Sequence, residues 1–114
     1  MKLLVIGSKA RVEKYLPDLP ITREVETVVV ERGASDDEIL NAASDADFIM
    51  ADAISPVSAR LIESMPNLKL IHSEGVAYNA IDLDAARARS VLVCNNAGAN
   101  AVGVAEQTVL LMLA

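Results

Sequence analysis

The chain has 114 residues and a mass of 12.1 kDa, enough for one domain with one buried core. Sixteen acidic residues against ten Lys and Arg give a net charge of −6, which argues against nucleic acid as a partner because such binding depends on basic side chains. The single cysteine excludes an internal disulfide and the single histidine excludes a multi-histidine site, so we expect no bound metal and a cytoplasmic protein. No apolar run reaches the roughly 20 residues of a membrane span, and no basic amphipathic segment suggests a membrane surface.

Strand and helix patterns alternate through the first half of the chain. In chain order they predict a strand, a helix, a strand, a helix and a strand at Leu3–Ile6, Lys9–Leu16, Val25–Glu31, Asp37–Ala43 and Phe48–Ala51. Pro17 and Pro20 should stop the first helix, because proline lacks the N–H group that continues a helix. Ser35 or Asp36 is expected to cap the second helix, and the acidic run 36–38 should complement its dipole rather than bind a metal.

The second half of the chain continues the alternation. It predicts a helix, a strand, a helix, a strand and a helix at Val57–Met65, Leu68–His72, Leu83–Arg89, Val91–Cys94 and Asn100–Ala114. Asp82 should cap the helix that follows it. The last helix is apolar on nearly all sides, and such a helix is normally buried by neighbours on several sides. We therefore expect this chain to be the front part of a longer protein.

Five short apolar strands separated by helices are typical of right-handed βαβ units. The pattern predicts an α/β fold of the flavodoxin-like kind: a parallel five-stranded sheet in the order 2-1-3-4-5, with helices on both faces. Such sheets bind ligands beyond the carboxyl ends of their strands. The loops after Ile6, Ala51, Ser73 and Cys94 should therefore lie along one functional edge.

The sequence lacks the common phosphate-binding motifs, and its single histidine and single cysteine are interpreted as structural residues. The sequence contains neither G-x-G-x-x-G nor G-x-x-x-x-G-K-[ST], so no backbone phosphate cradle is predicted. His72, at the end of the fourth expected strand, is interpreted as a structural residue. Cys94 follows three apolar strand residues, which predicts a small buried side chain rather than a nucleophile.

Two strand-to-helix segments are more informative, the segment 67–83 and the segment 94–106. Gly75 directly follows a strand and allows tight backbone approach, so the amides of Val76 and Ala77 can point at an anion. In the second segment Gly98 turns the chain, and Asn100 can either cap the last helix or offer its amide to a ligand. Spacing alone favours the interpretation of both segments as ordinary strand-to-helix turns.

The order of the motifs resembles one family. The runs P-N-L-K-L-I (66–71), G-V-A-Y-N-A-I-D-L (75–83), N-N-A-G-A-N (95–100) and V-A-E-Q-T (104–108) are similar to those of the NAD(P)-dependent D-2-hydroxyacid dehydrogenases. The resemblance is strong over roughly residues 45 to 114, and in the first half it extends only to the alternation of strands and helices. Several ordered motifs with matching spacing are more specific than any one of them.

The resemblance implies a site for a small 2-oxo or 2-hydroxy acid. It assigns the substrate carboxylate to the amides of Val76 and Ala77 after Gly75, and another wall of the pocket to the loop Ala51-Asp52-Ala53-Ile54. Asn100 would face the substrate and the nicotinamide, and Val104 would lie near the NAD or NADP cofactor. This chain departs from the family pattern, which usually has Gly at Ala77, Asp at Asn79 and Pro at Ala97.

The resemblance also implies a division of the chain and of the reaction. Residues 1–99 would form the substrate-binding domain, and residues 100–114 the helix that crosses into a separate NAD(P)-binding domain and contributes to a homodimer. The family's catalytic Arg, Glu and His would lie beyond Ala114, so these residues by themselves should contain no catalytic residue and show no turnover. Hydride transfer needs a general acid or base beside the carbonyl, and His72 does not match that position.

Two other functions need comparison with the dehydrogenase interpretation. A phosphorylation-switched receiver domain would use Asp52, at the end of the third strand, as its phosphoacceptor. It would lack Mg²⁺ ligands, because Gly7-Ser8 stands where the acidic pair belongs and Asn95-Asn96 replaces the expected lysine. A ligand-free domain that pairs through its last helix is compatible with the dehydrogenase interpretation.

Overall fold

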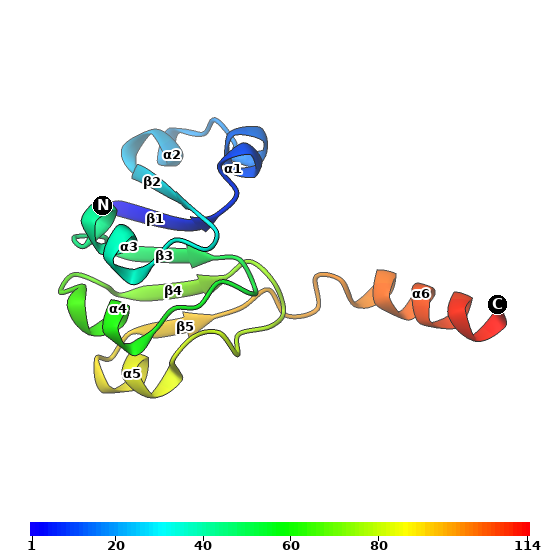
Figure 1. Cartoon of the computed structure of the whole chain (residues 1–114). Helices are drawn as coiled ribbons and strands as arrows, with labels where there is room; N and C mark the ends of the chain where they lie inside the picture. Colours follow the sequence, from blue (N-terminus) through cyan, green and yellow to red (C-terminus); the bar gives the residue numbers. More distant parts are fainter.

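Five parallel strands form one sheet in the computed structural model, which describes residues 1–114 (Figure 1). The strand order is β2-β1-β3-β4-β5, which confirms the predicted topology. The strands are β1 (Lys2–Gly7), β2 (Glu26–Glu31), β3 (Phe48–Ala51), β4 (Leu70–Ser73) and β5 (Leu92–Cys94). Because all five are parallel, their carboxyl ends lie at one edge of the sheet, where the candidate site is found.

Six helices connect or follow the strands. They are α1 (Lys9–Tyr15), α2 (Pro20–Glu24), α3 (Asp36–Ala43), α4 (Ala59–Ser64), α5 (Leu83–Ala88) and α6 (Ala101–Leu113). The helices α3, α4 and α5 cover one face of the sheet (Figure 1). On the opposite face α1 and Met50 of β3 line a common groove, so helices lie on both faces as predicted.

The core lies between the sheet and the helices α3, α4 and α5. Its sheet residues alternate along each strand, with Ile49 and Ala51 of β3 and Ile71 of β4 pointing to the same side. Leu61 and Ile62 of α4 pack onto them and are fully buried. Burial of one such side chain is worth about 1.5 to 3 kcal/mol, so this layer fixes the register that aligns the loops of the site.

Local capping sets where two of the core helices begin. The Oγ of Ser35 accepts a hydrogen bond from the N–H of Glu38 at 3.3 Å, and the Glu38 carboxylate accepts one from the N–H of Ser35 at 2.7 Å. The N–H and the Oγ of Ser35 both donate to the Glu38 carboxylate and lower the pKa of Glu38, and this reciprocal pattern confirms the predicted cap. Asp82 caps α5 as predicted, accepting from the N–H of Ala85 at 2.9 Å.

The structure corrects several sequence predictions. Pro20 begins α2 instead of ending a helix, because proline fits the first helical position, where its missing N–H has no partner in any case. Cys94 is exposed rather than buried, because β5 is an edge strand and no helix covers its side chain. Three predicted elements also begin later in the structure than expected. Val57 pairs with Ile81 in a parallel bridge and precedes α4, while Leu68 and Val91 precede β4 and β5.

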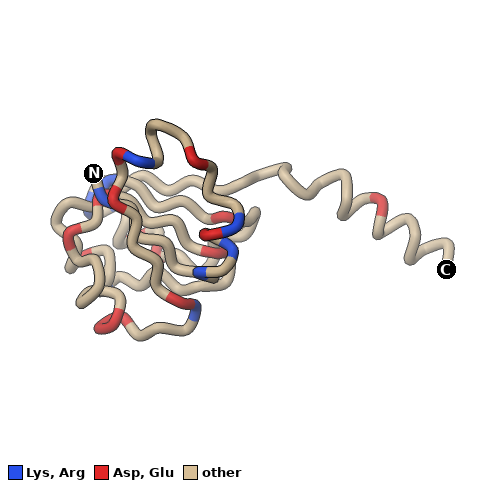
Figure 2. The backbone as a smooth tube through the Cα atoms, turned by 90° about the horizontal axis from the view of Figure 1, so that it is seen from above, with Lys and Arg blue, Asp and Glu red and all other residues tan.

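The helix α6 projects away from the body of the molecule (Figure 1). All of its residues are exposed, including Leu110, Leu111 and Leu113, and Glu106 is its only charged residue (Figure 2). None of the helices combines the length and the apolar character that a membrane crossing requires. The structure thus separates a packed α/β body from one uncovered apolar helix.

Candidate functional site

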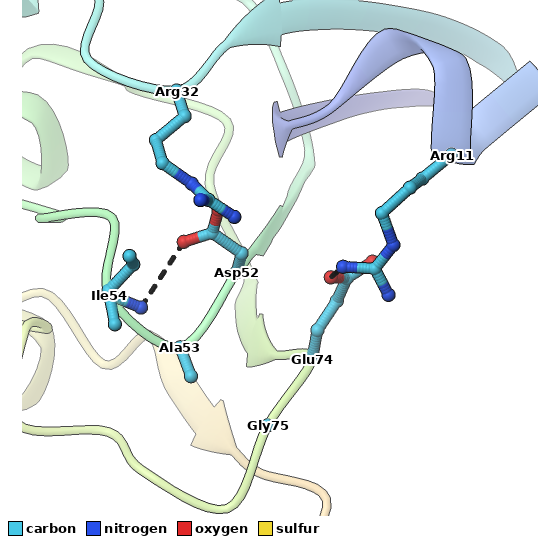
Figure 3. A pocket seen from close by; sticks show the side chains of 7 residues that line it. All are labelled: Arg11, Arg32, Asp52, Ala53, Ile54, Glu74 and Gly75. Atoms are coloured by element: carbon cyan, nitrogen blue, oxygen red, sulfur yellow. Dashed lines mark hydrogen bonds and ion pairs between the residues drawn. The ribbon is translucent and has the colours of Figure 1, made fainter.

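An open cleft of about 300 Å³ lies at the carboxyl edge of the sheet (Figure 3). The loop after β3 contributes Asp52, Ala53 and Ile54, and the loop after β4 contributes Glu74 and Gly75. Arginine side chains from α1 and from the turn after β2 complete the lining (Arg11 and Arg32). The cleft therefore lies at the edge that the sequence predicted. Of the predicted site residues Asp52, Ala53 and Gly75 line it, whereas Val76 and Ala77 follow Gly75 outside the lining.

The loop after β4 is held by its carbonyl groups. The N–H of Asn96 donates to the Gly75 carbonyl at 2.9 Å, and the Nδ2 of Asn95 donates to the Val76 carbonyl at 2.7 Å. The Oγ of Ser73 donates to the Ala77 carbonyl at 2.6 Å. The two informative sequence segments thus meet, because the loop after β5 fixes the loop after β4.

The amides of the same loop have no such partners. Neither the N–H of Val76 nor that of Ala77 donates a hydrogen bond to another group of the protein. Free backbone N–H groups beside fixed carbonyls can donate hydrogen bonds to an anion. The structure therefore leaves available the two donors that the sequence analysis assigned to a carboxylate.

Gly75 lies directly against Ala53 of the neighbouring loop. A Cβ atom added at Gly75 would lie 2.6 Å from the Cβ of Ala53 and 4.0 Å from the amide nitrogen of Ala77. The Ala77 nitrogen and Ala53 thus lie on the same side of Gly75. A residue without a side chain is required at position 75 for the two loops to approach this closely.

Asp52 is the buried charge of the cleft, 7% exposed. Its Oδ1 accepts hydrogen bonds from the N–H groups of Ile54 and Ser55 at 3.2 and 2.8 Å, and its Oδ2 accepts one from the Nε of Arg32 at 2.5 Å. Burial by itself would raise the pKa of Asp52, but hydrogen bonds from Ser55, Arg32 and Ile54 outweigh it and lower that pKa. Asp52 is therefore an ionised structural centre that fixes both its own loop and an arginine.

A second ion pair crosses the rim of the cleft. The Nη1 of Arg11 lies 3.5 Å from the Oε2 of Glu74, and the Arg11 side chain is 60% exposed. Such an exposed pair at this distance contributes little to stability. Each of the two arginines of the cleft thus faces one carboxylate, and the cleft gathers two positive and two negative side chains.

Asn100 and Val104 are not brought to this cleft. They line a separate hollow of about 450 Å³ along α6, together with residues of that helix only and the preceding Ala99. Asn100 is the N-cap residue of α6 but makes no capping hydrogen bond with its side chain. Ala51 is buried at the end of β3 beneath Asp52 and supports the cleft without lining it. His72 is also outside the cleft, with its Nδ1 3.0 Å from the Sγ of Cys94.

Sequence reasoning missed the two arginines of the cleft. Arg32 follows β2 directly and Arg11 follows β1 by one helical turn, so both come from the carboxyl ends of strands. The rule that located the other loops would have included them had the turn after β2 been considered as well. Glu74 lies within the segment 67–83 but was given no separate role.

The fold and the cleft define a ligand-binding α/β domain whose site lies at the carboxyl edge of a doubly wound sheet. A family model described as "D-isomer specific 2-hydroxyacid dehydrogenase, catalytic domain" matches residues 4–110. The chain belongs to this family, and the predicted resemblance is confirmed. The receiver-domain alternative is not supported, because the family match is to a different class of protein and Asp52 is paired with Arg32 rather than with further acidic residues.

The relatives are much longer than this chain. A D-3-phosphoglycerate dehydrogenase from Methanocaldococcus jannaschii is 35% identical over 96 residues, which are 84% of this chain and 18% of the relative. A hydroxypyruvate reductase from Thermotoga maritima is 31% identical over 102 residues, 90% of this chain and 33% of the relative. The chain thus spans 18% and 33% of the length of these two relatives.

Solved structures share the fold over nearly the whole chain. A NAD-dependent formate dehydrogenase from Staphylococcus aureus, in complex with NAD, superposes with a TM-score of 0.81 at 24% identity, covering 99% of this chain and 38% of that one. A 2-hydroxyacid dehydrogenase from Ketogulonicigenium vulgare gives a TM-score of 0.75 at 28% identity, covering 98% and 34%. The α/β architecture is therefore the one found in dehydrogenases of this family.

Proposed function

We propose that this chain forms the substrate-binding domain of an NAD(P)-dependent D-2-hydroxyacid dehydrogenase. The carboxylate of a small 2-oxo or 2-hydroxy acid is bound by the N–H groups of Val76 and Ala77, with Asp52 and Ala53 forming the opposite wall above Ala51. The observation that carries this proposal is the loop after β4, whose carbonyls are engaged while these two amides are free. The family's own chemistry is consistent with a carboxylate in this position.

The division of labour within the chain follows from the proposal. Residues 1–99 form the substrate-binding unit, which is supported by the packed body that ends with β5. Residues 100–114 form the helix that leads toward the cofactor, where Asn100 would face substrate and nicotinamide and Val104 the cofactor. The exposed apolar surface of α6 supports its pairing with a second copy in a homodimer. We place the protein in the cytoplasm.

The residues present do not by themselves fit a dinucleotide. The sequence has no glycine-rich phosphate motif, and the hollow along α6 offers Asn100, Gln107 and Thr108 but no basic side chain for a pyrophosphate. We therefore assign NAD or NADP binding to a domain that these 114 residues do not include. When bound, such a cofactor accepts or donates the hydride.

The proposal also predicts no turnover by these residues alone. The only histidine, His72, lies outside the cleft, so no imidazole can serve as acid or base beside the substrate carbonyl. Incubation of the chain with a 2-oxo acid and NADH should leave the nicotinamide absorbance unchanged. Oxidation of NADH at a rate above that of a boiled control would contradict this part of the proposal.

A titration followed by NMR tests the carboxylate site. Pyruvate added to the ¹⁵N-labelled chain should shift the Val76 and Ala77 amide signals in a saturable way, because hydrogen bonding to a carboxylate deshields an N–H group. Methyl pyruvate, which keeps the ketone but has an uncharged methyl ester in place of the carboxylate, is the control and should leave both signals in place. If pyruvate fails to move these amides, or if the ester moves them equally, the proposed site is wrong.

A further inference from the structure

Arg32 enters the cleft with only part of its guanidinium engaged. Its Nε donates to the Oδ2 of Asp52, while its two terminal nitrogens, Nη1 and Nη2, donate to no group of the protein. The side chain reaches down from the turn after β2 toward the loop 52–54 (Figure 3). Two N–H₂ groups therefore remain available at the wall of the cleft, in the forked geometry that binds a carboxylate or phosphate by two parallel hydrogen bonds.

Arg32 is held in place both at its backbone and at its guanidinium group. Its backbone N–H donates to the Gly7 carbonyl at 3.1 Å, which fixes the turn beside the end of β1. At the other end the buried Asp52 holds the guanidinium and is itself fixed by two backbone N–H groups. An arginine ordered in this way loses little conformational freedom when it binds an anion, so the fork is preorganised.

Of the two arginines that line the cleft, Arg32 is the one held more firmly by its carboxylate partner. The two arginine side chains are similarly exposed, Arg11 60% and Arg32 52%, but Arg32 lies 2.5 Å from a carboxylate that is only 7% exposed, whereas Arg11 lies 3.5 Å from one that is 31% exposed. No lysine lines the cleft. A monoanionic acid bound at Val76 and Ala77 would use the two amides and leave the terminal nitrogens of Arg32 to water.

We propose that Arg32 is a specificity-determining residue that binds a second anionic group, so that the preferred substrate is a 2-hydroxy or 2-oxo acid with an anionic group besides its carboxylate. This inference rests on the proposed function, because it takes the first carboxylate to occupy the Val76 and Ala77 amides. The second group is a carboxylate or a phosphate at the far end of a short carbon chain. The cleft of about 300 Å³ is at the lower end of the range for ligand sites and suits an acid of this size.

Two matched pairs of 2-hydroxy acids test the proposal on the whole 114-residue chain. D-malate differs from D-lactate by a carboxylate, and D-3-phosphoglycerate differs from D-glycerate by a phosphate. Calorimetry and the Val76 and Ala77 amide shifts measure binding of each acid. In at least one pair the acid with the second anionic group should bind at least about tenfold more tightly than the acid without it. This ratio corresponds to about 1.4 kcal/mol from charge-assisted hydrogen bonds to the guanidinium fork. The pair that shows the difference identifies the second group.

The variant Arg32→Gln should abolish this preference. The acid with the second anionic group should then bind no more than about twofold more tightly than D-lactate or D-glycerate. The affinity for D-lactate or D-glycerate itself should stay within about threefold of that of the native chain. Arg32→Lys should keep only part of the preference, because an ammonium group cannot form the fork. Arg87→Gln, on α5 and paired with Asp84, removes the same charge away from the cleft and should leave the preference intact.

Three outcomes contradict the inference in different ways. If both acids of each pair bind equally to the native chain, Arg32 recognises no second anion. If Arg32→Gln weakens the binding of both acids of a pair equally while the midpoint of thermal unfolding is unchanged, Arg32 shapes the carboxylate site instead of selecting the substrate. If no acid shifts the Val76 and Ala77 amides at all, the proposed function itself fails.

Discussion

Gly75 and Ala53 lie so close that a methyl group at position 75 would sit 2.6 Å from the Cβ of Ala53. This single approach joins the loop after β3 to the loop after β4, so the wall of the cleft and the free amides of Val76 and Ala77 are positioned relative to each other. Real Cβ atoms do not come this close, and one of the two loops must move if the glycine is replaced.

The variant Gly75→Ala should therefore lose ligand affinity. We expect about tenfold weaker binding of the preferred acid, because displacing the amides by a fraction of an ångström misaligns both hydrogen bonds. The free energy of unfolding should fall by about 1 to 3 kcal/mol from the overpacked contact. Calorimetry with the acid and urea denaturation measure the two effects.

A second substitution shows whether the collision is the cause. In Ala53→Gly/Gly75→Ala the opposing methyl group is gone, so most of the lost affinity should return. Gly103→Ala is the matched glycine control, since nothing lies within 4 Å of that position on the exposed α6. If the double variant binds as weakly as Gly75→Ala alone, backbone flexibility rather than contact with Ala53 explains the loss.

Asp52 should make stability depend on pH in the acid range. Its pKa is lowered in the folded chain from an ordinary value of 3.8, since the hydrogen bonds from Ser55, Arg32 and Ile54 overcome the effect of burial. A carboxyl with a depressed pKa contributes stability that is fully present above its unfolded pKa and is lost as the pH falls through the folded value. We expect the free energy of unfolding to decline below about pH 4, as measured by urea denaturation at several pH values.

The variant Asp52→Asn isolates this contribution. At pH 7 it should cost about 1 to 3 kcal/mol, because a neutral amide leaves the Arg32 guanidinium and two backbone donors less well satisfied. Between about pH 5 and pH 3 it should lose less stability than the native chain. Asp84→Asn, at the exposed ion pair with Arg87, is the control and should change the pH 7 value little. If the Asp52→Asn variant keeps the native pH profile, other carboxyls are responsible for the acid sensitivity.

Periodicity and apolar runs were sufficient to predict the sheet. Each of the five strands is a short apolar segment, and the flavodoxin-like order followed from the alternation with helices. The helix α2 could not be predicted in the same way, because five residues contain too little periodicity and Pro20 is compatible with both a helix start and a helix end. Exposure of Cys94 depends on which strand lies at the edge of the sheet and on what covers that strand. The apolar residues next to Cys94 in the sequence indicate neither of these.

The site was predictable where it depends on backbone and unpredictable where it depends on side chains from distant elements. A glycine after a strand indicated the free amides of Val76 and Ala77 without any tertiary information. The pairing of Arg32 with Asp52 joins residues twenty positions apart through the ends of two strands, β2 and β3, that are not neighbours in the sheet. Only the fold shows that these two side chains meet.

Leu61 should be among the most sensitive positions of the core. It is fully buried between α4 and the sheet, and Leu61→Ala should lower the free energy of unfolding by about 2 to 5 kcal/mol, because it removes buried methyl groups and leaves a cavity. Leu92→Ala is the matched control, since Leu92 of β5 is 67% exposed and its loss should cost no more than about 0.5 kcal/mol. Urea denaturation of both variants checks the difference, and similar values for the two would mean that the open face of β5 is covered in solution.

The exposed helix α6 should make the chain self-associate. Leu110, Leu111, Met112 and Leu113 form a contiguous apolar end that no part of the body covers, and uncovered patches of this kind mark interfaces. Sedimentation equilibrium should show a dimer that dissociates on dilution, and Leu111→Lys should weaken it by about tenfold or more, because a charge would then be buried in the interface. Ala10→Lys, on the exposed face of α1, adds the same charge to the body and should leave the dimer intact. A monodisperse monomer at millimolar concentration, with the helical signals of residues 101–113 still present, would show that α6 needs no partner, and the proposed homodimer would then have to be abandoned.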